Sequence, residues 1–106
     1  MAEIVVTDQN FESEVTRSDI PVLLDFWADW CAPCRMLSPV VGGIAGEYEG
    51  RLKVGKVNVD DEPELAEKFG VSSIPMLVVI KDGKPVSAGV GYKPKEQVEK
   101  LFEEFI

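Results

Sequence analysis

Histidine is absent from this chain of 106 residues, and cysteine occurs only twice. Without histidine, Cys–His and Ser–His catalytic pairs are excluded. Proton transfer near neutral pH must then use a perturbed carboxylate, a perturbed lysine, a thiol or water. Basic residues are few, with 11 Lys and Arg against 19 Asp and Glu, and the net charge is −8. Such a charge repels phosphate backbones, which argues against nucleic-acid binding, and otherwise serves solubility or steers basic partners.

Long apolar runs are also missing. No stretch of about 18 consecutive apolar residues occurs, so we expect no membrane-spanning helix. The start carries Glu3 and Asp8 instead of a basic segment followed by an apolar one, which argues against a secretory signal. The length predicts a single domain over residues 1–106, and the hydrophobic share of 45% suffices for one core. No cofactor-binding motif is visible, and we expect a cytoplasmic monomer without a metal.

Strand-like and helix-like apolar patterns alternate along the chain. Strands are predicted over residues 4–6, 22–28, 52–59, 76–80 and 85–90. Helices are predicted over residues 11–17, 33–48 and 63–69 and from about residue 94 onward. Asp82-Gly83 predicts a tight hairpin turn between the last two strands. The order β-α-β-α-β-α-β-β-α predicts an α/β fold, with a mixed five-stranded sheet flanked by four helices.

Some segments carry more local information. The nearly continuous apolar run over residues 22–28 predicts a central strand covered on both faces. In residues 52–59 both faces mix apolar and polar side chains, so the alternation is imperfect. Thr7 or Asp8 is expected to cap the first helix. Trp27 is assigned to the core.

The two cysteines lie in the motif Trp30-Cys31-Ala32-Pro33-Cys34, at a predicted strand-to-helix junction. Such a pair has three interpretations: a redox dithiol, half of a zinc site, or two inert core cysteines. A structural zinc site needs four ligands, usually Cys or His, and the chain offers no further Cys and no His. Inert core cysteines fit poorly beside a tryptophan and a proline at such a junction. The sequence therefore favours a redox-active pair.

The start of a helix suits this chemistry. Residues three apart on a helix have Cβ atoms about 5–6 Å apart, and at a helix start they can close to the roughly 3.5–4.5 Å of a disulfide. Cys31 is predicted in the first turn, where free N–H groups and the helix dipole favour the attacking thiolate. Cys34 is better placed to resolve a mixed disulfide. Pro33 fits the first turn because it lacks an N–H. Arg35 either adds positive charge near the pair or is an ordinary exposed arginine.

On these residues the chain closely resembles the thioredoxin family, over almost its whole length. The matching segments, in the family's order and spacing, are residues 25–35 (Asp-Phe-Trp-Ala-Asp-Trp-Cys-Ala-Pro-Cys-Arg), Lys56-Val57-Asn58-Val59-Asp60, Ile74-Pro75, Asp82-Gly83 and Val90-Gly91. The resemblance implies the thioredoxin fold, with a cis peptide bond before Pro75 and the proline packed opposite the disulfide.

Two residues depart from the family pattern. Ala32 stands where the family usually has glycine, and Met76 where threonine is common. The residues between the cysteines, Ala32 and Pro33, are expected to tune the redox poise. Met76 adds a soft apolar contact and is expected to affect partner preference.

Asp25 is a carboxylate in an apolar strand, so it needs a raised pKa or a partner. The resemblance implies that it takes the proton from Cys34 and that Lys56 pairs with it. Plainer alternatives are a structural hydrogen bond for Asp25, a solvent-facing Lys56 and an ordinary turn glycine at Gly91. The resemblance also implies an apolar rim that docks an extended substrate segment, formed by Trp30, Ile74, Pro75, Val90 and Gly91.

The resemblance implies a protein-disulfide reductase, an electron-transport protein of cell redox homeostasis. Cys31 would attack a disulfide in a protein substrate, Cys34 would resolve the mixed disulfide, and a thioredoxin reductase would restore the dithiol. Two alternatives stay open. One is a disulfide oxidase or isomerase, and the other is a non-catalytic docking subunit that uses the same apolar patch.

Overall fold

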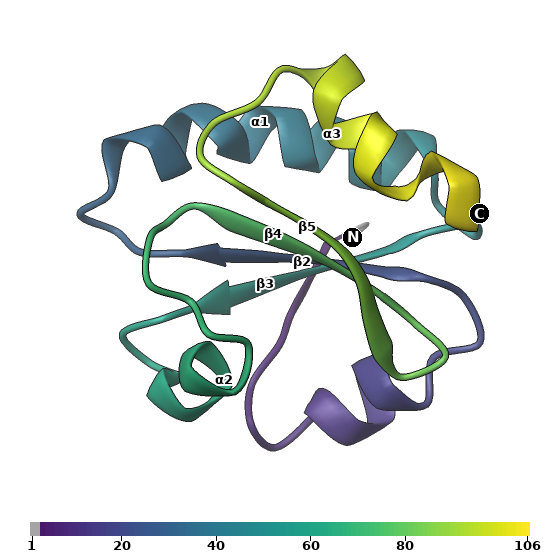
Figure 1. The fold of residues 1–106 in the computed structure, drawn as a ribbon, viewed down its shortest axis with the longest axis horizontal. Helices are drawn as coiled ribbons and strands as arrows, with labels where there is room; N and C mark the ends of the chain where they lie inside the picture. Colours follow the sequence, from purple (N-terminus) through teal and green to yellow (C-terminus); the bar gives the residue numbers. More distant parts are fainter. Residues whose placement is uncertain (1–2) are drawn as a thin grey trace.

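A computed structural model describes residues 3–106, and Met1 and Ala2 of the expected domain lie outside the described residues. The strands within residues 3–106 are β1 (Glu3–Val5), β2 (Val22–Trp27), β3 (Lys53–Asn58), β4 (Met76–Lys81) and β5 (Lys84–Val90). They form one sheet in the order β1-β3-β2-β4-β5 (Figure 1). Strand β3 is parallel to β1 and β2, whereas β4 is antiparallel to β2 and β5 to β4. The predicted mixed sheet with an antiparallel edge is therefore confirmed.

Helices cover both faces of the sheet. Within the described residues they are the π-helix η1 (Glu12–Thr16), the α-helices α1 (Ala32–Glu47), α2 (Pro63–Lys68) and α3 (Lys95–Phe102), and the short 3₁₀ helix η2 (Glu103–Phe105). Helices α1 and α3 lie on one face, and α2 and η1 lie on the other (Figure 1). None of these helices is long and apolar enough to cross a membrane.

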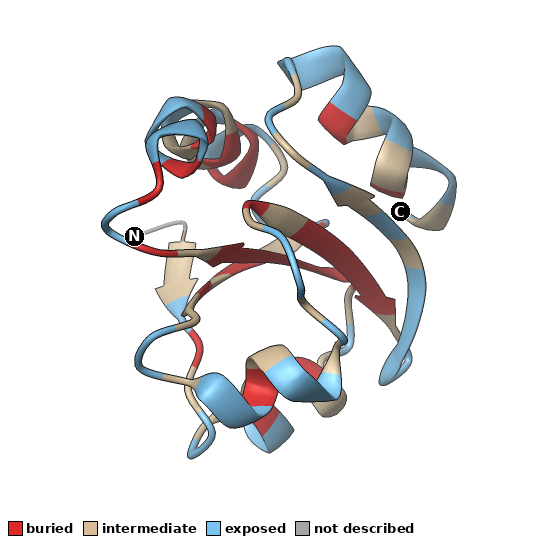
Figure 2. Cartoon of the chain, turned by 60° about the vertical axis from the view of Figure 1, so that its left-hand side comes forward, coloured by how far each residue is buried: buried red, intermediate tan, exposed pale blue. Residues whose placement is uncertain are grey.

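The core consists of two apolar layers, one on each side of the sheet. Leu23 and Leu77 pack with Ile44 of α1 and Phe102 of α3. On the other side Leu24, Phe26 and Val78 pack with Val15 of η1 and Leu65 of α2. The central strands β2 and β4 are buried along most of their length (Figure 2). Burying each such side chain contributes about 1.5–3 kcal/mol, which explains why the run of β2 is apolar at every position except Asp25.

The mixed pattern of β3 has specific causes. A Cβ at Gly55 would lie 2.6 Å from Cγ2 of Val6 and 3.2 Å from Cδ2 of Leu24, so only glycine fits between these side chains. Lys53 reaches out of the sheet and donates to the backbone oxygen of Glu14 at 2.9 Å. The polar positions of this strand thus have tertiary partners that strand periodicity alone does not reveal.

Two local predictions are wrong and one is confirmed. Neither Thr7 nor Asp8 caps η1; instead the Thr7 hydroxyl accepts a bond of 3.3 Å from the Asn10 N–H in a turn before the helix. Trp27 is half-buried, not internal, because it lies at the end of β2 and its side chain lines an open pocket beside Lys56 and Val5. The Asp82-Gly83 hairpin turn is present, with φ of 53° and 78° at its two residues.

Candidate active site

The cysteine pair lies where β2 leads into α1. Cys31 is the N-cap of α1, with extended backbone angles of φ −95° and ψ 107°, and Pro33 occupies the first turn. Proline costs no hydrogen bond there, because the N–H groups of a first turn have no partner in the helix. The sequence therefore begins α1 with Cys31 at its edge and Cys34 within its first turn.

Cys31 and Cys34 form a disulfide, with their Cα atoms 5.2 Å apart. The Sγ atom of Cys31 also accepts the backbone N–H of Cys34 at 3.2 Å. Both side chains are nearly buried, with exposed fractions of 4% for Cys31 and 3% for Cys34, so burial does not distinguish them. Their positions on the helix do, because Cys31 is the N-cap, where the N–H of Cys34 and the positive end of the helix dipole would stabilise a thiolate in the reduced protein.

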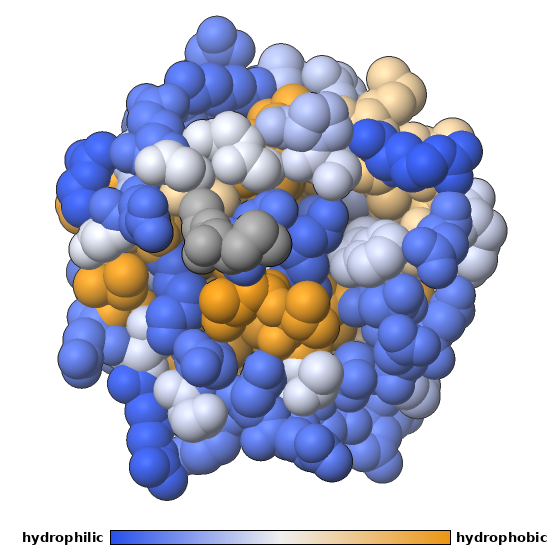
Figure 3. All heavy atoms as spheres, turned by 180° about the vertical axis from the view of Figure 1, so that it is seen from behind, coloured by the Kyte–Doolittle hydropathy of each residue, from blue (hydrophilic) through white to orange (hydrophobic). Residues whose placement is uncertain are grey.

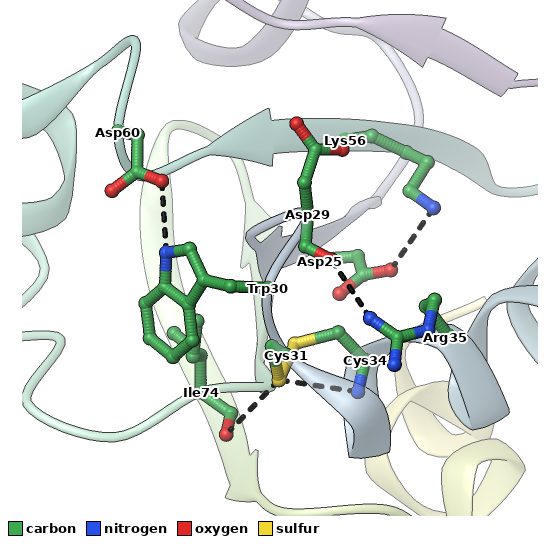
Figure 4. The surroundings of a disulfide bond; sticks show 9 residues. All are labelled: Asp25, Asp29, Trp30, Cys31, Cys34, Arg35, Lys56, Asp60 and Ile74. Carbon is green, nitrogen blue, oxygen red and sulfur yellow. Dashed lines mark hydrogen bonds and ion pairs between the residues drawn. A yellow bond between two sulfur atoms is a disulfide. The ribbon is translucent and has the colours of Figure 1, made fainter.

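The loop before β4 lies against the disulfide. The Ile74–Pro75 peptide bond is cis, as the resemblance implied. The backbone oxygen of Ile74 lies 3.8 Å from Sγ of Cys31, and Ile74 packs on the two cysteines (Figure 4). The Pro75 oxygen accepts the N–H of Gly91 at 2.8 Å, which ties the start of β4 to the end of β5. The fold thus brings Ile74, Pro75, Val90 and Gly91 to one place.

The expected apolar rim is present in part. Trp30 is 68% exposed and Val90 55%, whereas Ile74 and Gly91 are half-buried. Pro75 is buried and therefore does not belong to the exposed part of the rim. Beside Trp30 lies an open pocket of about 420 Å³, also lined by Ile74, Val59 and Val71.

Trp30 has a partner that the sequence analysis missed. Its indole Nε1–H donates to Oδ2 of Asp60 at 2.9 Å (Figure 4). Asp60 follows β3, and Trp30 follows the adjacent parallel strand β2, so both lie at the same edge of the sheet. In the sequence, the only indication of this hydrogen bond was that Trp30 and Asp60 each follow a predicted strand. The bond fixes the orientation of the exposed ring.

Asp25 and Lys56 face each other across β2 and β3, as the resemblance implied. Asp25 is 1% exposed, and its Oδ2 lies 3.7 Å from Nζ of Lys56, too far for a hydrogen bond. Neither carboxylate oxygen has a hydrogen-bond partner among residues 3–106. Burial raises the pKa of Asp25 to about 6, against the partial opposing effect of Lys56. A carboxyl with this pKa can exchange protons near neutral pH.

Two further groups complete the surroundings. The ammonium of Lys56 bonds the Ser38 hydroxyl of α1 at 3.2 Å, a contact that the sequence analysis missed. Ser38 lies one helical turn after Cys34, so both side chains are on the same face of α1. This spacing was the feature of the sequence that could have indicated a place for Ser38 near the site. Arg35 is exposed, and its guanidinium donates to the backbone oxygen of Asp29 at 2.8 Å. Arg35 thus braces the loop that precedes the cysteines.

The positions of the two departures from the family pattern are also clear. Ala32 is exposed at the first position of α1, where alanine favours helix more than glycine does. Met76 is half-buried and stands opposite Val90 in the β4–β5 ladder. It therefore borders the exposed part of the rim.

Comparison with known proteins agrees with this geometry. The thioredoxin family model matches residues 2–104. The chain belongs to the thioredoxin family. It is 50% identical over 101 residues to the thioredoxin of Porphyra purpurea, covering 95% of this chain and 94% of the relative. Thioredoxin 1 of Nostoc sp. has the same identity and coverage. The thioredoxin of Haemophilus influenzae is 47% identical over the full length of both chains.

Membership of the thioredoxin family, together with a Cys-x-x-Cys disulfide at a helix start, identifies the activity. The protein is a thiol–disulfide oxidoreductase with a thioredoxin fold, and its enzymatic activity is that of a protein-disulfide reductase. Thioredoxins generally work with a thioredoxin reductase and with disulfide-containing substrates, and electron transport and redox homeostasis are their typical roles.

Proposed function

We propose that Cys31 is the attacking thiolate and Cys34 the resolving one. The Cys31 thiolate attacks one sulfur of a target disulfide, forms a mixed disulfide and releases the other target sulfur as a thiolate. The Cys34 thiolate then attacks Sγ of Cys31, which releases the second target thiolate and leaves the Cys31–Cys34 disulfide. The observation that carries this assignment is the position of Cys31 at the N-cap, where its sulfur accepts the N–H of Cys34.

Asp25 and Lys56 complete the proposed mechanism. Asp25 takes the proton of the Cys34 thiol, directly or through a water molecule, and so generates the second nucleophile. Lys56 supplies the countercharge when Asp25 is ionised. In Figure 4 these two residues lie on one side of the disulfide, and Trp30 and Ile74 lie on the other. Proton transfer and substrate contact thus use different sides of the cysteine pair.

The protein is proposed to be a reductant, so electrons pass from its dithiol to the disulfide of the substrate. We propose that a thioredoxin reductase restores the dithiol and that the protein works in the cytoplasm, where thiols are kept reduced. Ala32 and Pro33 stand between the cysteines and are proposed to set the redox poise. The equilibrium with glutathione measures that poise, and we expect a potential of about −270 mV, as is typical of a reductant. A potential near about −120 mV would assign the protein to the oxidases instead.

Trp30, Ile74, Val90 and Gly91 are proposed to dock an extended segment of the substrate. We expect Trp30→Ala and Gly91→Asp each to raise KM for protein disulfides roughly tenfold, because an exposed tryptophan anchor contributes about 1–2 kcal/mol to such contacts. Gly91 has φ of +92°, so aspartate there adds backbone strain as well as charge to the rim. Steady-state kinetics with several protein disulfides measure the effect.

A small aromatic disulfide serves as a second substrate, because it is too short to use the rim. Its reduction rate is expected to change little in the Trp30→Ala variant. Val86→Ala is the matched control, since Val86 is an exposed apolar residue near the other end of β5. Unchanged kinetics of both rim variants with protein disulfides would place the docking surface elsewhere.

A further inference from the structure

The ammonium of Lys56 is shared between two oxygen atoms. It lies 3.2 Å from the Ser38 hydroxyl and 3.7 Å from Oδ2 of Asp25. The neutral hydroxyl therefore holds the cation at hydrogen-bond distance, while the buried carboxylate has only its longer-range charge. Trp27 borders the cation on another side, with its ring centroid 5.1 Å from Nζ. The Lys56 ammonium is thus held by Ser38 and Trp27, and not by Asp25, the carboxylate whose charge it neutralises.

A second carboxylate, that of Glu3, lies under α1, the helix that carries Ser38. Glu3 of β1 is opposite Val54, two residues before Lys56 on β3, so Glu3 and Lys56 occupy the sheet face beneath α1. The Glu3 carboxyl approaches α1 where a Cβ on Gly42 would lie 3.8 Å away. Oxygen Oε2 of Glu3 is buried and has no hydrogen-bond partner among residues 3–106. Glu3 and Lys56 also line one pocket of about 340 Å³.

This pocket opens on the side of the molecule where the chain begins. Figure 3 shows apolar side chains gathered near the centre of one face of the molecule. Val5, which also lines the pocket, is 72% exposed. Ile4, Val5, Asn58 and Asp61 also line the pocket. Glu3 and Lys56 thus border the same pocket as polar and apolar residues of β1 and of the loop after β3.

The charges that face Asp25 come from a few elements. Strand β3 contributes Lys56 and β1 contributes Glu3, while β4 places the apolar Leu77 opposite Asp25. Cys34 of α1 is bound in the disulfide and carries no charge in this structure. Two carboxylates and one ammonium thus lie on this face of the sheet. Had Lys56 served Asp25 alone, the pair would behave as a buried salt bridge with a carboxylate of low basicity.

We propose that Ser38 and Glu3 are positioning residues of the exchange reaction: the Ser38 hydroxyl holds the Lys56 ammonium at hydrogen-bond distance, while Glu3 places a second negative charge on the same face of the sheet. Together they keep the Asp25 carboxylate basic enough to accept the Cys34 proton near neutral pH. The direction of the electrostatic effects agrees, since Glu3 raises the pKa of Asp25 and Lys56 lowers it. The inference rests on the proposed role of Asp25 as the base.

The test is a carboxyl-carbon NMR titration of Asp25 in the oxidised protein, where neither cysteine titrates. We expect Glu3→Gln to move the Asp25 midpoint to lower pH by about half a pH unit, because removal of a nearby negative charge favours ionisation. Glutamine keeps the size of the side chain, so a merely structural role would leave the midpoint in place. Ser38→Ala is expected to shift it in the same direction, since Lys56 is then free to approach Asp25.

Glu67→Gln is the matched control, because Glu67 is an exposed carboxylate of α2 on the opposite face of the sheet. The titration midpoint of Asp25 in the Glu67→Gln variant should equal the midpoint in the wild type. An Asp25 midpoint in Glu3→Gln equal to that in Glu67→Gln would overturn the role of Glu3, and an unshifted midpoint in Ser38→Ala would overturn that of Ser38. The titration follows charge and not turnover, so its outcome is separate from whether Asp25 acts as the base.

Discussion

Replacement of Cys31 by serine should abolish the reduction of protein disulfides, lowering the rate by at least about a thousandfold. The serine hydroxyl is not ionised at neutral pH, even at a helix N-terminus, and it does not displace a thiolate from a disulfide. The chain contains no third cysteine that could replace Cys31. An insulin-type turbidity assay, with an excess of a small dithiol as electron donor, measures the loss.

Cys34→Ser is the informative companion of this variant. It keeps the proposed attacking sulfur and removes the resolving one, so it should form mixed disulfides and fail to turn over. Circular dichroism of both variants checks that the fold survives the loss of the disulfide. Full activity of Cys31→Ser would end the redox interpretation and leave the apolar rim as a docking surface only.

Asp25→Asn should slow reduction at least about tenfold at pH 7.5, because the Cys34 thiol then lacks its base. The sign of the pH dependence follows from the pKa of about 6. Above that pH the wild-type carboxylate is ionised and accepts a proton, whereas below it the carboxyl is neutral, like asparagine. The two proteins should therefore differ most above pH 6 and converge near about pH 5. Rates of disulfide reduction measured across this range provide the comparison.

Asp19→Asn is the matched control for that change. Asp19 is exposed in the segment before β2, so this substitution removes the same charge without touching the buried site. Its pH–rate profile should follow the wild type. An identical profile for Asp25→Asn and the wild type would show that Asp25 has a structural role alone.

Much of the fold follows from short-range patterns. The apolar run of β2 and the Asp82-Gly83 turn each encode their structure within a few residues, and both are present as predicted. The start of α1 is also local, because Pro33 and the residues around it determine where helical hydrogen bonding begins. By contrast, a cis bond before Pro75 is a minority state of X–Pro bonds, and only the family resemblance indicated it.

Contacts between distant parts of the chain account for what was missed. Asp60 is 30 residues from Trp30, and Ser38 is 18 residues from Lys56, so neither bond belongs to a local motif. The partial exposure of Trp27 likewise depends on a pocket that it lines together with residues of β1 and β3, which are distant in the sequence. The resemblance placed Asp25 opposite Lys56, but not the 3.7 Å separation that leaves the carboxylate without a hydrogen bond.

The order of attack is the central claim, and trapping of the mixed disulfide tests it most directly. Reduced Cys34→Ser and Cys31→Ser proteins are mixed with a disulfide-containing protein substrate, and the covalent complexes are quantified by non-reducing electrophoresis and mass spectrometry. We predict that Cys34→Ser accumulates a complex linked through Cys31, while Cys31→Ser forms little or none. A complex that forms as fast through Cys34 in the Cys31→Ser protein would contradict the assignment of Cys31 as the attacking residue.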